Sequence, residues 1–277
     1  QMLQDLDMPI YDEEAESGIV KTLVVRAAAH TDDVQLVVIT NSPKLPHKHD
    51  LLTRIADELP QVTSVMQNIN PGKTSLIWGD ETVHLAGAEA ITEKLDGLAF
   101  KLSARAFLQL NPSQMEVLYG EAKKALNLQP GETVVDAYSG IGTIGLSLAD
   151  VAEEVRGMDV IPEAVADSNE NAAANGITNT HYELGTAEEL LPKWIMTGFH
   201  PDAIVVDPPR TGLDDTLIET LLAVRPPKLV YISCNPSTLA KDLVELTHDY
   251  QVDYIQSVDM MPQTARCEAV VKLSRRH

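Results

Sequence analysis

A thiol and a carboxylate near the C-terminus are the side chains with the clearest capacity for chemistry. Cys234 lies in the segment YISCNP at residues 231–236, and Glu268 directly follows Cys267. A lone cysteine is usually an inert core residue, but a thiol between a strand and a helix is placed to act as a nucleophile. Strand alternation sends Cys267 and Glu268 to opposite faces, so only one of them can share a pocket with Cys234. Glu268 adds a base to such a pocket, and we expect simple burial for Cys267.

A glycine-rich turn stands about a hundred residues upstream, in the segment DAYSGIGTIG at residues 136–145. Glycines such as Gly140 let the backbone approach a ligand, although G-x-G also occurs as a plain tight turn. Asp159 follows about twenty residues later, where a carboxylate can accept hydrogen bonds from both hydroxyls of a ribose. These residues favour a nucleoside cofactor. The segment formally matches G-x-G-x-x-G, so its spacing does not separate nicotinamide dinucleotides from S-adenosylmethionine.

A stiff loop follows the apolar run at residues 204–206. Two prolines in the segment DPPR at residues 207–210 stiffen the chain and present Asp207 and nearby carbonyls at a fixed position. A stiff polar wall suits a planar base, whereas the plainer interpretation is a rigid turn after a buried strand.

The elements that would position these residues alternate regularly from about residue 112. This alternation is typical of a parallel sheet with helices on both faces. A leading helix is expected at 112–128, with a proline at its start. We expect strands, with helices between them, at 132–138, 154–160, 181–185, 202–207, 228–234, 250–259 and 267–273. Ligands of an open α/β sheet bind beyond the carboxyl ends of its strands, where the candidate residues fall.

The first hundred residues predict a smaller, mostly antiparallel α+β domain without a catalytic motif. The expected elements are strands at 19–29, 34–40, 62–70, 74–79 and 81–87 and a helix at 48–59. We therefore expect two domains, 1–97 and 98–277.

Composition excludes several classes of protein. Hydrophobic residues make up 44% and charged residues 22% of the 277 residues, which argues against disorder, collagen-like sequence and coiled coil. Two cysteines cannot make a disulfide framework, and they are too few for a zinc or iron–sulfur site without other ligands, so we expect no metal and reduced thiols. No run reaches the roughly 18 apolar residues of a membrane helix, and no signal peptide is evident, so we expect a cytoplasmic protein.

The net charge of −20 has the wrong sign for an electrostatic nucleic-acid binder. The chain also begins with Gln1 rather than methionine, so we expect that a preceding segment is missing.

The conjunction of motifs resembles the RNA uridine-5-methyltransferase family, which modifies transfer and ribosomal RNA. The motifs are FLQLN at 107–111, the turn at 136–142, DPPRTG at 207–212, and SCNP at 233–236 with Glu268 downstream. The resemblance covers essentially the whole chain, including QNIN at 67–70, and is closest to Gram-positive enzymes that methylate 23S ribosomal RNA. It implies a Rossmann-like class I methyltransferase sheet preceded by a central domain.

Several features depart from the family pattern. Family members usually begin with a β-barrel RNA-binding domain, and some hold an iron–sulfur cluster on four cysteines; neither is present here. A missing barrel would soften the argument from net charge against nucleic-acid binding, because affinity for phosphates could reside in that barrel. Leu108 stands where the family commonly has phenylalanine, and Arg266-Cys267 where it often has His-Val.

The resemblance implies specific roles for residues. Cys234 would be the nucleophile that adds to carbon 6 of uracil, and Glu268 the base that resolves the adduct. The residues implied to contact S-adenosylmethionine, which leaves as S-adenosylhomocysteine, are Gln109, Tyr138, Gly140, Asp159 and Asp207. The implied partner is RNA, most specifically a loop uridine of 23S ribosomal RNA, with no membrane and no obligate protein partner.

The sequence leaves other functions open. The substrate could be transfer RNA, a small molecule or an exocyclic base nitrogen, and nitrogen methylation needs no covalent thiol. A methyltransferase-fold protein that binds RNA without turnover is the remaining alternative. We also hypothesise that the first hundred residues grip the nucleotides that flank the target.

Overall fold

The computed structural model describes residues 1–276, and the chain divides into two compact units. Unit 1 comprises residues 1–94 and 101–105, and unit 2 comprises 95–100 and the chain from 106 onward. The strands β5 (Ile91–Leu95) and β6 (Leu98–Leu102) pair with each other, and each unit receives part of this hairpin. The boundary predicted between residues 97 and 98 therefore falls at the turn of the hairpin.

Unit 2 is built on one 7-stranded sheet in the order β12-β13-β11-β10-β7-β8-β9. Its strands are β7 (Thr133–Ala137), β8 (Glu154–Asp159), β9 (Thr180–Leu184), β10 (Ala203–Val206), β11 (Lys228–Ser233), β12 (Tyr250–Val258) and β13 (Glu268–Arg275). Neighbouring strands from β9 to β11 are parallel, whereas β13 runs antiparallel to both β11 and β12. The predicted strands and the Rossmann-like α/β class are confirmed.

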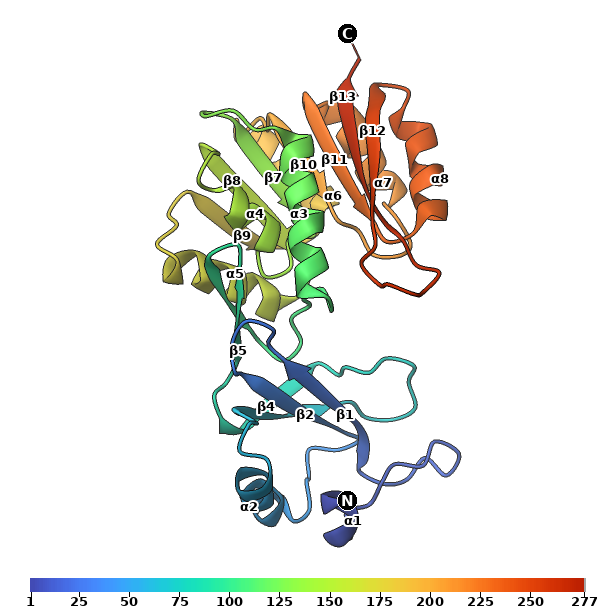
Figure 1. Ribbon diagram of the computed structural model, residues 1–277. Helices are drawn as coiled ribbons and strands as arrows, with labels where there is room; N and C mark the ends of the chain where they lie inside the picture. The colour runs from blue at the N-terminus through green and yellow to red at the C-terminus, as the bar shows by residue number, and fades with distance from the viewer. Residues whose placement is uncertain (277) are drawn as a thin grey trace. The chain divides into compact units, whose positions relative to one another are not determined.

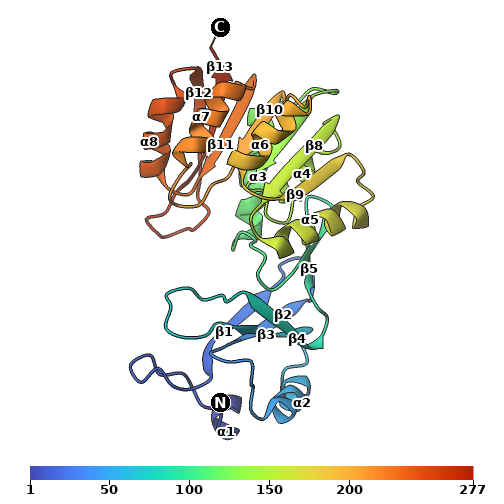
Figure 2. The ribbon, with the colours of Figure 1, turned by 180° about the vertical axis from the view of Figure 1, so that it is seen from behind.

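Helices cover both faces of this sheet. They are α3 (Pro112–Leu126), α4 (Thr143–Leu148), α5 (Pro162–Ala174), α6 (Ala187–Met196), α7 (Asp215–Val224) and α8 (Pro236–Leu246). Helices α3 and α4 lie in front of the sheet in Figure 1, and α6 and α7 lie in front of it in the reverse view of Figure 2. The central strands β10 and β11 are apolar and buried because they are covered on both sides.

Unit 1 is a smaller α+β structure. Its 4-stranded sheet has the order β1-β2-β3-β4. The elements are α1 (Met2–Asp5), β1 (Val20–Ala27), β2 (Val34–Thr40), α2 (Lys48–Glu58), β3 (Ser64–Ile69) and β4 (Glu81–Gly87). Strands β1 and β4 pair antiparallel with their neighbours, and β2 and β3 pair in parallel. The parallel pair follows from α2, which separates β2 from β3 along the chain.

The strand predicted at 74–79 is wrong, because this segment is a loop held by side-chain amides. Asn68 is fully buried on β3, its Nδ2 donates to the carbonyls of Gly79 at 3.0 Å and Glu81 at 3.1 Å, and its Oδ1 accepts from the amide of Gly79 at 2.7 Å. Asn70 Nδ2 likewise donates to the carbonyl of Leu76 at 2.7 Å. The polar groups of the loop backbone are thus hydrogen-bonded in part to side-chain amides and not to a neighbouring strand.

Replacing Asn68 by alanine should destabilise unit 1 by about 2–3 kcal/mol, because Gly79 and Glu81 would lose buried partners. The free energy of unfolding from urea titration measures this. Gln61→Ala removes an exposed amide in the same unit and serves as the control. An Asn68→Ala stability within about 0.5 kcal/mol of wild type would contradict this description of the loop.

Candidate active site

The candidate residues of unit 2 gather at one end of its strands, the carboxyl end of the parallel ones. Parallel strands place their carboxyl ends at the same edge, and the antiparallel strand β13 begins there. The residues at or just beyond these strand ends are Tyr138 after β7, Asp159 on β8, Asp207 after β10, Cys234 after β11 and Glu268 on β13. The reversal of β13 explains why Glu268 lies at the start of its strand.

The glycine turn after β7 is fixed by the carboxylate of Asp159. Oδ2 of Asp159 accepts from the amide of Gly140 at 2.9 Å, and Oδ1 accepts from the amide of Ile161 at 2.9 Å. Gly140 and Gly142 have φ values of 55° and 83°, the left-handed region that favours glycine. The carboxylate of Asp159 therefore has a set position beside the turn and keeps free lone pairs for a further donor.

Two polar atoms beneath this turn are buried without a hydrogen-bond partner among the described residues. They are Oδ1 of Asp136 and Oγ of Ser139. The other oxygen of Asp136 accepts from the amide of Gly145 at 2.7 Å, and burial raises the pKa of Asp136 to about 7. Buried polar atoms ordinarily have partners, so these two fit a site completed by a bound polar or cationic group.

The thiol of Cys234 and the carboxyl of Glu268 come together through the pairing of β11 with β13. Ser233 and Ala269 are the last antiparallel partners of this ladder, and Cys234 and Glu268 are their neighbours in the chain. The two side chains are close enough for the charge of Glu268 to raise the pKa of Cys234. Both residues are half-buried, as is Cys267, whose Sγ donates to the carbonyl of Glu268 at 3.3 Å. The expected full burial of Cys267 is therefore not observed.

Acidic side chains gather around the thiol. Burial raises the pKa of Cys234, the carboxylates of Glu268 and Asp207 raise it further, and the guanidinium of Arg210 acts in the opposite direction. Burial also raises the pKa of Glu268. The pKa of Asp207 rises to about 8 through burial and the neighbouring charges of Glu268 and Asp136. Such a group of acidic side chains favours cations and disfavours further negative charge.

The segment at 107–111 carries Gln109, half-buried between the exposed side chains of Phe107 and Leu110. Asn111 caps α3 by accepting from the amide of Gln114 at 3.3 Å, and its Nδ2 donates to the carbonyl of Met260 at 3.1 Å. This second bond connects the segment to the chain that leads into β13. Sequence reasoning assigned no role to Asn111, although an asparagine before a proline is a helix-start signal.

Tyr119 of α3 was also missed. It is 8% exposed, and its pKa is raised by burial and by the charge of Asp207. Its position in an apolar helix pattern gave no signal that it would lie near the carboxylates.

Within residues 1–276, no group of three or more His, Cys, Asp or Glu side chains is arranged to hold a metal ion. No helix in that range combines the length and apolarity needed to cross a membrane.

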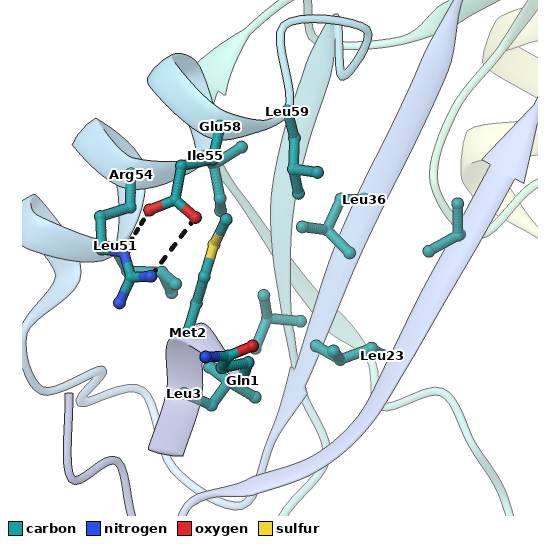
Figure 3. Close-up of a pocket in the computed structure, with 12 residues that line it drawn as sticks. Gln1, Met2, Leu3, Leu23, Leu36, Leu51, Arg54, Ile55, Glu58 and Leu59 are labelled. Carbon is teal, nitrogen blue, oxygen red and sulfur yellow. Dashed lines mark hydrogen bonds and ion pairs between the residues drawn. The ribbon is translucent and has the colours of Figure 1, made fainter. Parts of the chain in front are cut away.

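An apolar hollow of about 450 Å³ lies in unit 1, between α1, α2 and the first two strands (Figure 3). Leucine side chains such as Leu36 and Leu51 line it, and an ion pair between Arg54 and Glu58 borders it. The hollow contains neither cysteine nor any of the candidate site residues.

Comparisons with known proteins show the family of this chain. Residues 87–276 match the family "tRNA (Uracil-5-)-methyltransferase". Uncharacterized RNA methyltransferases of Lactiplantibacillus plantarum and Enterococcus faecalis are 70% and 61% identical over 99% of this chain, and the chain spans 57% and 60% of their lengths.

A solved structure gives a further comparison. The tRNA (uracil-54, C5)-methyltransferase of Pyrococcus abyssi in complex with S-adenosyl-L-homocysteine superposes with a TM-score of 0.79 at 28% identity, covering 98% of this chain and 64% of that one. The chain described here belongs to the tRNA (uracil-5-)-methyltransferase family.

Proposed function

We propose that this chain transfers a methyl group from S-adenosylmethionine to carbon 5 of uridine in RNA, through a covalent bond between Cys234 and carbon 6. The observation that supports the proposal is that Cys234 and Glu268 adjoin the last pair of the β11–β13 ladder and that the charge of Glu268 acts on the thiol. The family match and the RNA methyltransferase relatives support it. Because the chain spans 57–60% of those relatives, the activity of the whole protein is part of the proposal.

The target we propose is a loop uridine of 23S ribosomal RNA, on the strength of the motif resemblance. Transfer RNA is the second candidate, favoured by the tRNA (uracil-54, C5)-methyltransferase from Pyrococcus abyssi. Two free thiols fit a reducing compartment such as the cytoplasm, where this modification would occur.

The site fits S-adenosylmethionine on three counts: the positive-φ glycine turn, the unpartnered buried atoms of Asp136 and Ser139, and the excess of carboxylates. When bound, the cofactor supplies an electrophilic methyl group on a positively charged sulfur. Asp159 would accept from the ribose hydroxyls, and Asp207 would contribute to the polar wall beside the base. Gln109, Tyr138 and Gly140 complete the proposed set.

The thiol is needed because carbon 5 of uracil is a weak nucleophile. Addition of the Cys234 thiolate to carbon 6 forms a sulfur–carbon bond and moves the electrons of the carbon 5–carbon 6 double bond into an enolate. Carbon 5 then has the electron density to accept a methyl group. Sulfur is suited to this role because it is both a strong nucleophile and a workable leaving group, whereas a serine hydroxyl is neither.

Glu268 completes the reaction as a base. After methylation, carbon 5 carries both its original proton and the methyl group. Removal of that proton by the Glu268 carboxylate returns an electron pair to the carbon 5–carbon 6 bond, and the sulfur–carbon 6 bond breaks. The thiolate regains a proton, and one proton is released overall. Without the base, the covalent adduct should persist.

The RNA must present its target outside the base stack. A stacked uridine cannot reach a thiol at a sheet edge, so the base must lie in a loop or turn outward. We propose that unit 1 contacts the flanking nucleotides through the loop at 71–78, which exposes Lys73, Leu76 and Ile77.

Replacing Lys73 and Leu76 together by alanine should weaken RNA binding about fivefold or more while the cofactor affinity stays unchanged, because a phosphate contact and a base contact would be lost. Fluorescence anisotropy with labelled RNA and calorimetry with the cofactor measure the two affinities. Glu89→Ala, an exposed change in the same unit, is the control. Unchanged RNA affinity would defeat the assignment of this loop.

Asp207→Asn should stabilise the protein, increasingly so as the pH rises. The pKa of Asp207 rises from 3.8 to about 8 on folding, so the folded state holds a proton that the unfolded chain has released, and the stability from this group falls as pH rises through that window. Asparagine removes this penalty. The gain in Tm should be absent well below pH 3.8 and greatest near pH 8, by about 2–4 °C for each kcal/mol of the penalty that is removed.

Differential scanning calorimetry across this pH range is the measurement. Glu219→Gln changes an exposed carboxylate on α7 and is expected to show no such trend. A gain that did not depend on pH would show that ionisation of Asp207 is not its cause.

Cys234→Ala should abolish methylation, and Glu268→Gln should accumulate a covalent protein–RNA adduct that survives denaturing electrophoresis. The expected loss of turnover is at least about 10³-fold for each, because the nucleophile and the base act in one sequence. Labelled methyl transfer and gel mobility are the measurements. Substantial turnover by Cys234→Ala would favour nitrogen methylation, and absence of cofactor binding by calorimetry would favour a protein without turnover.

A further inference from the structure

The loop between β10 and α7 is attached to the helix that follows the thiol. A turn closes it, with the amide of Gly212 donating to the carbonyl of Pro209 at 2.9 Å and Arg210 inside the turn. The carbonyl of Arg210 accepts from Nδ2 of Asn235 at 2.9 Å and from Oγ1 of Thr238 at 3.3 Å. Residues immediately after Cys234 thus hold the backbone of Arg210.

A buried carboxylate on α8 provides a deeper attachment. Asp242 is fully buried, and its Oδ2 accepts from the amide of Leu213 at 2.8 Å and from the hydroxyl of Tyr231 at 2.7 Å. Tyr231 belongs to β11, the strand that ends beside Cys234. One oxygen atom therefore joins the loop, the strand and the helix that surround the thiol.

The fit around this oxygen is close. A Cβ atom on Gly212 would lie 2.5 Å from Oδ2 of Asp242, and the φ of Gly212 is 80°. Only glycine allows the loop backbone to approach the carboxylate in this conformation.

Asp242 is difficult to explain by stability alone. Its Oδ1 is buried without a hydrogen-bond partner among the described residues. A buried carboxylate costs more free energy than a well-packed apolar side chain at the same place, unless it is paired and fully hydrogen-bonded. The two donors that Asp242 does engage are those that fix the loop relative to β11.

We propose that Asp242 is a positioning residue for the reaction: its carboxylate clamps the loop at 207–213 to β11 and α8, and so fixes the backbone of Arg210 next to the segment that follows Cys234. This inference rests on the proposed function in assigning Cys234 as the nucleophile. The clamp itself is a geometric feature of unit 2 that needs neither RNA nor cofactor.

The position of Arg210 matters because of the charges that face the thiol. The carboxylates of Glu268 and Asp207 raise the pKa of Cys234, and the guanidinium of Arg210 lowers it. If the loop loosened and Arg210 moved away, the carboxylate of Glu268, which lies on β13 and outside the loop, would act without this opposing charge. The thiolate fraction at a given pH, and with it the nucleophilic reactivity of Cys234, would then fall.

The test measures the reactivity of the thiol directly. In a Cys267→Ser background, the rate of Cys234 alkylation by iodoacetamide is followed by mass spectrometry as a function of pH. Asp242→Ala should shift the alkylation profile to higher pH, with a rate near neutral pH about tenfold lower for a shift of one pKa unit. Arg210→Gln should produce a similar shift. The double variant should add little, because both changes remove the same interaction.

Two control variants separate positioning from general stability. Asp242→Asn retains one oxygen for both donors and places its amino group where Oδ1 has no partner, so it should alkylate within about threefold of the parent rate. Glu245→Ala removes an exposed carboxylate from the same helix and should leave the profile unchanged. The Tm of every variant is measured in parallel.

A parent-like alkylation profile for Asp242→Ala would overturn the proposal, whatever its Tm, and so would full additivity with Arg210→Gln. If Asp242→Ala does not fold, Gly212→Ala disrupts the clamp from the loop side and should produce the same shift, and a parent-like profile would again overturn it. These outcomes are distinct from failure of the proposed function, which would appear as absence of RNA methylation by the unmodified chain.

Discussion

The site depends on the antiparallel pairing of β13 with β11. This ladder is in register from Lys228 with Ser274 to Ser233 with Ala269, and Cys234 and Glu268 are the chain neighbours of its last pair. A shift of one residue would turn the carboxylate to the other face of the sheet and separate it from the thiol. Because the paired strands are buried and apolar, the register is strongly specified by packing. The core of unit 2 thereby fixes the two groups that the proposed reaction requires.

The same edge carries an electrostatic cost. Asp136, Asp207 and Glu268 all have raised pKa values, because burial disfavours their charged forms, and for Asp207 the neighbouring charges of Glu268 and Asp136 add to the rise. A protein selected for stability alone would not collect carboxylates there, whereas a site for a positively charged methyl donor would. These acidic side chains suit a cationic cofactor, but they do not attract RNA. The net charge of −20 likewise gives the chain no general attraction for phosphates. Under the proposed function, RNA would be recognised through particular surfaces and not through overall charge.

Much of unit 2 was predictable, since its buried strands are continuous apolar runs and its motifs follow them directly. The reversal of β13 was not, because strand order and direction depend on long-range packing that local patterns do not encode. Likewise, residues 74–79 have the composition of a strand, but the buried amides of Asn68 and Asn70 hold them as a loop. The bond of Asn111 to Met260 and the bonds of Asp242 join residues more than ten positions apart, so no local pattern could assign these contacts.

The most direct test of the covalent mechanism is mass spectrometry of the protein after reaction with RNA that contains 5-fluorouridine at the target position. Fluorine leaves no proton at carbon 5 for Glu268 to remove, so the adduct cannot be resolved. The mechanism predicts a peptide containing Cys234 that carries the methylated, fluorinated nucleotide. Methylation of ordinary RNA together with an unmodified Cys234 peptide, or an adduct on Cys267, would contradict it.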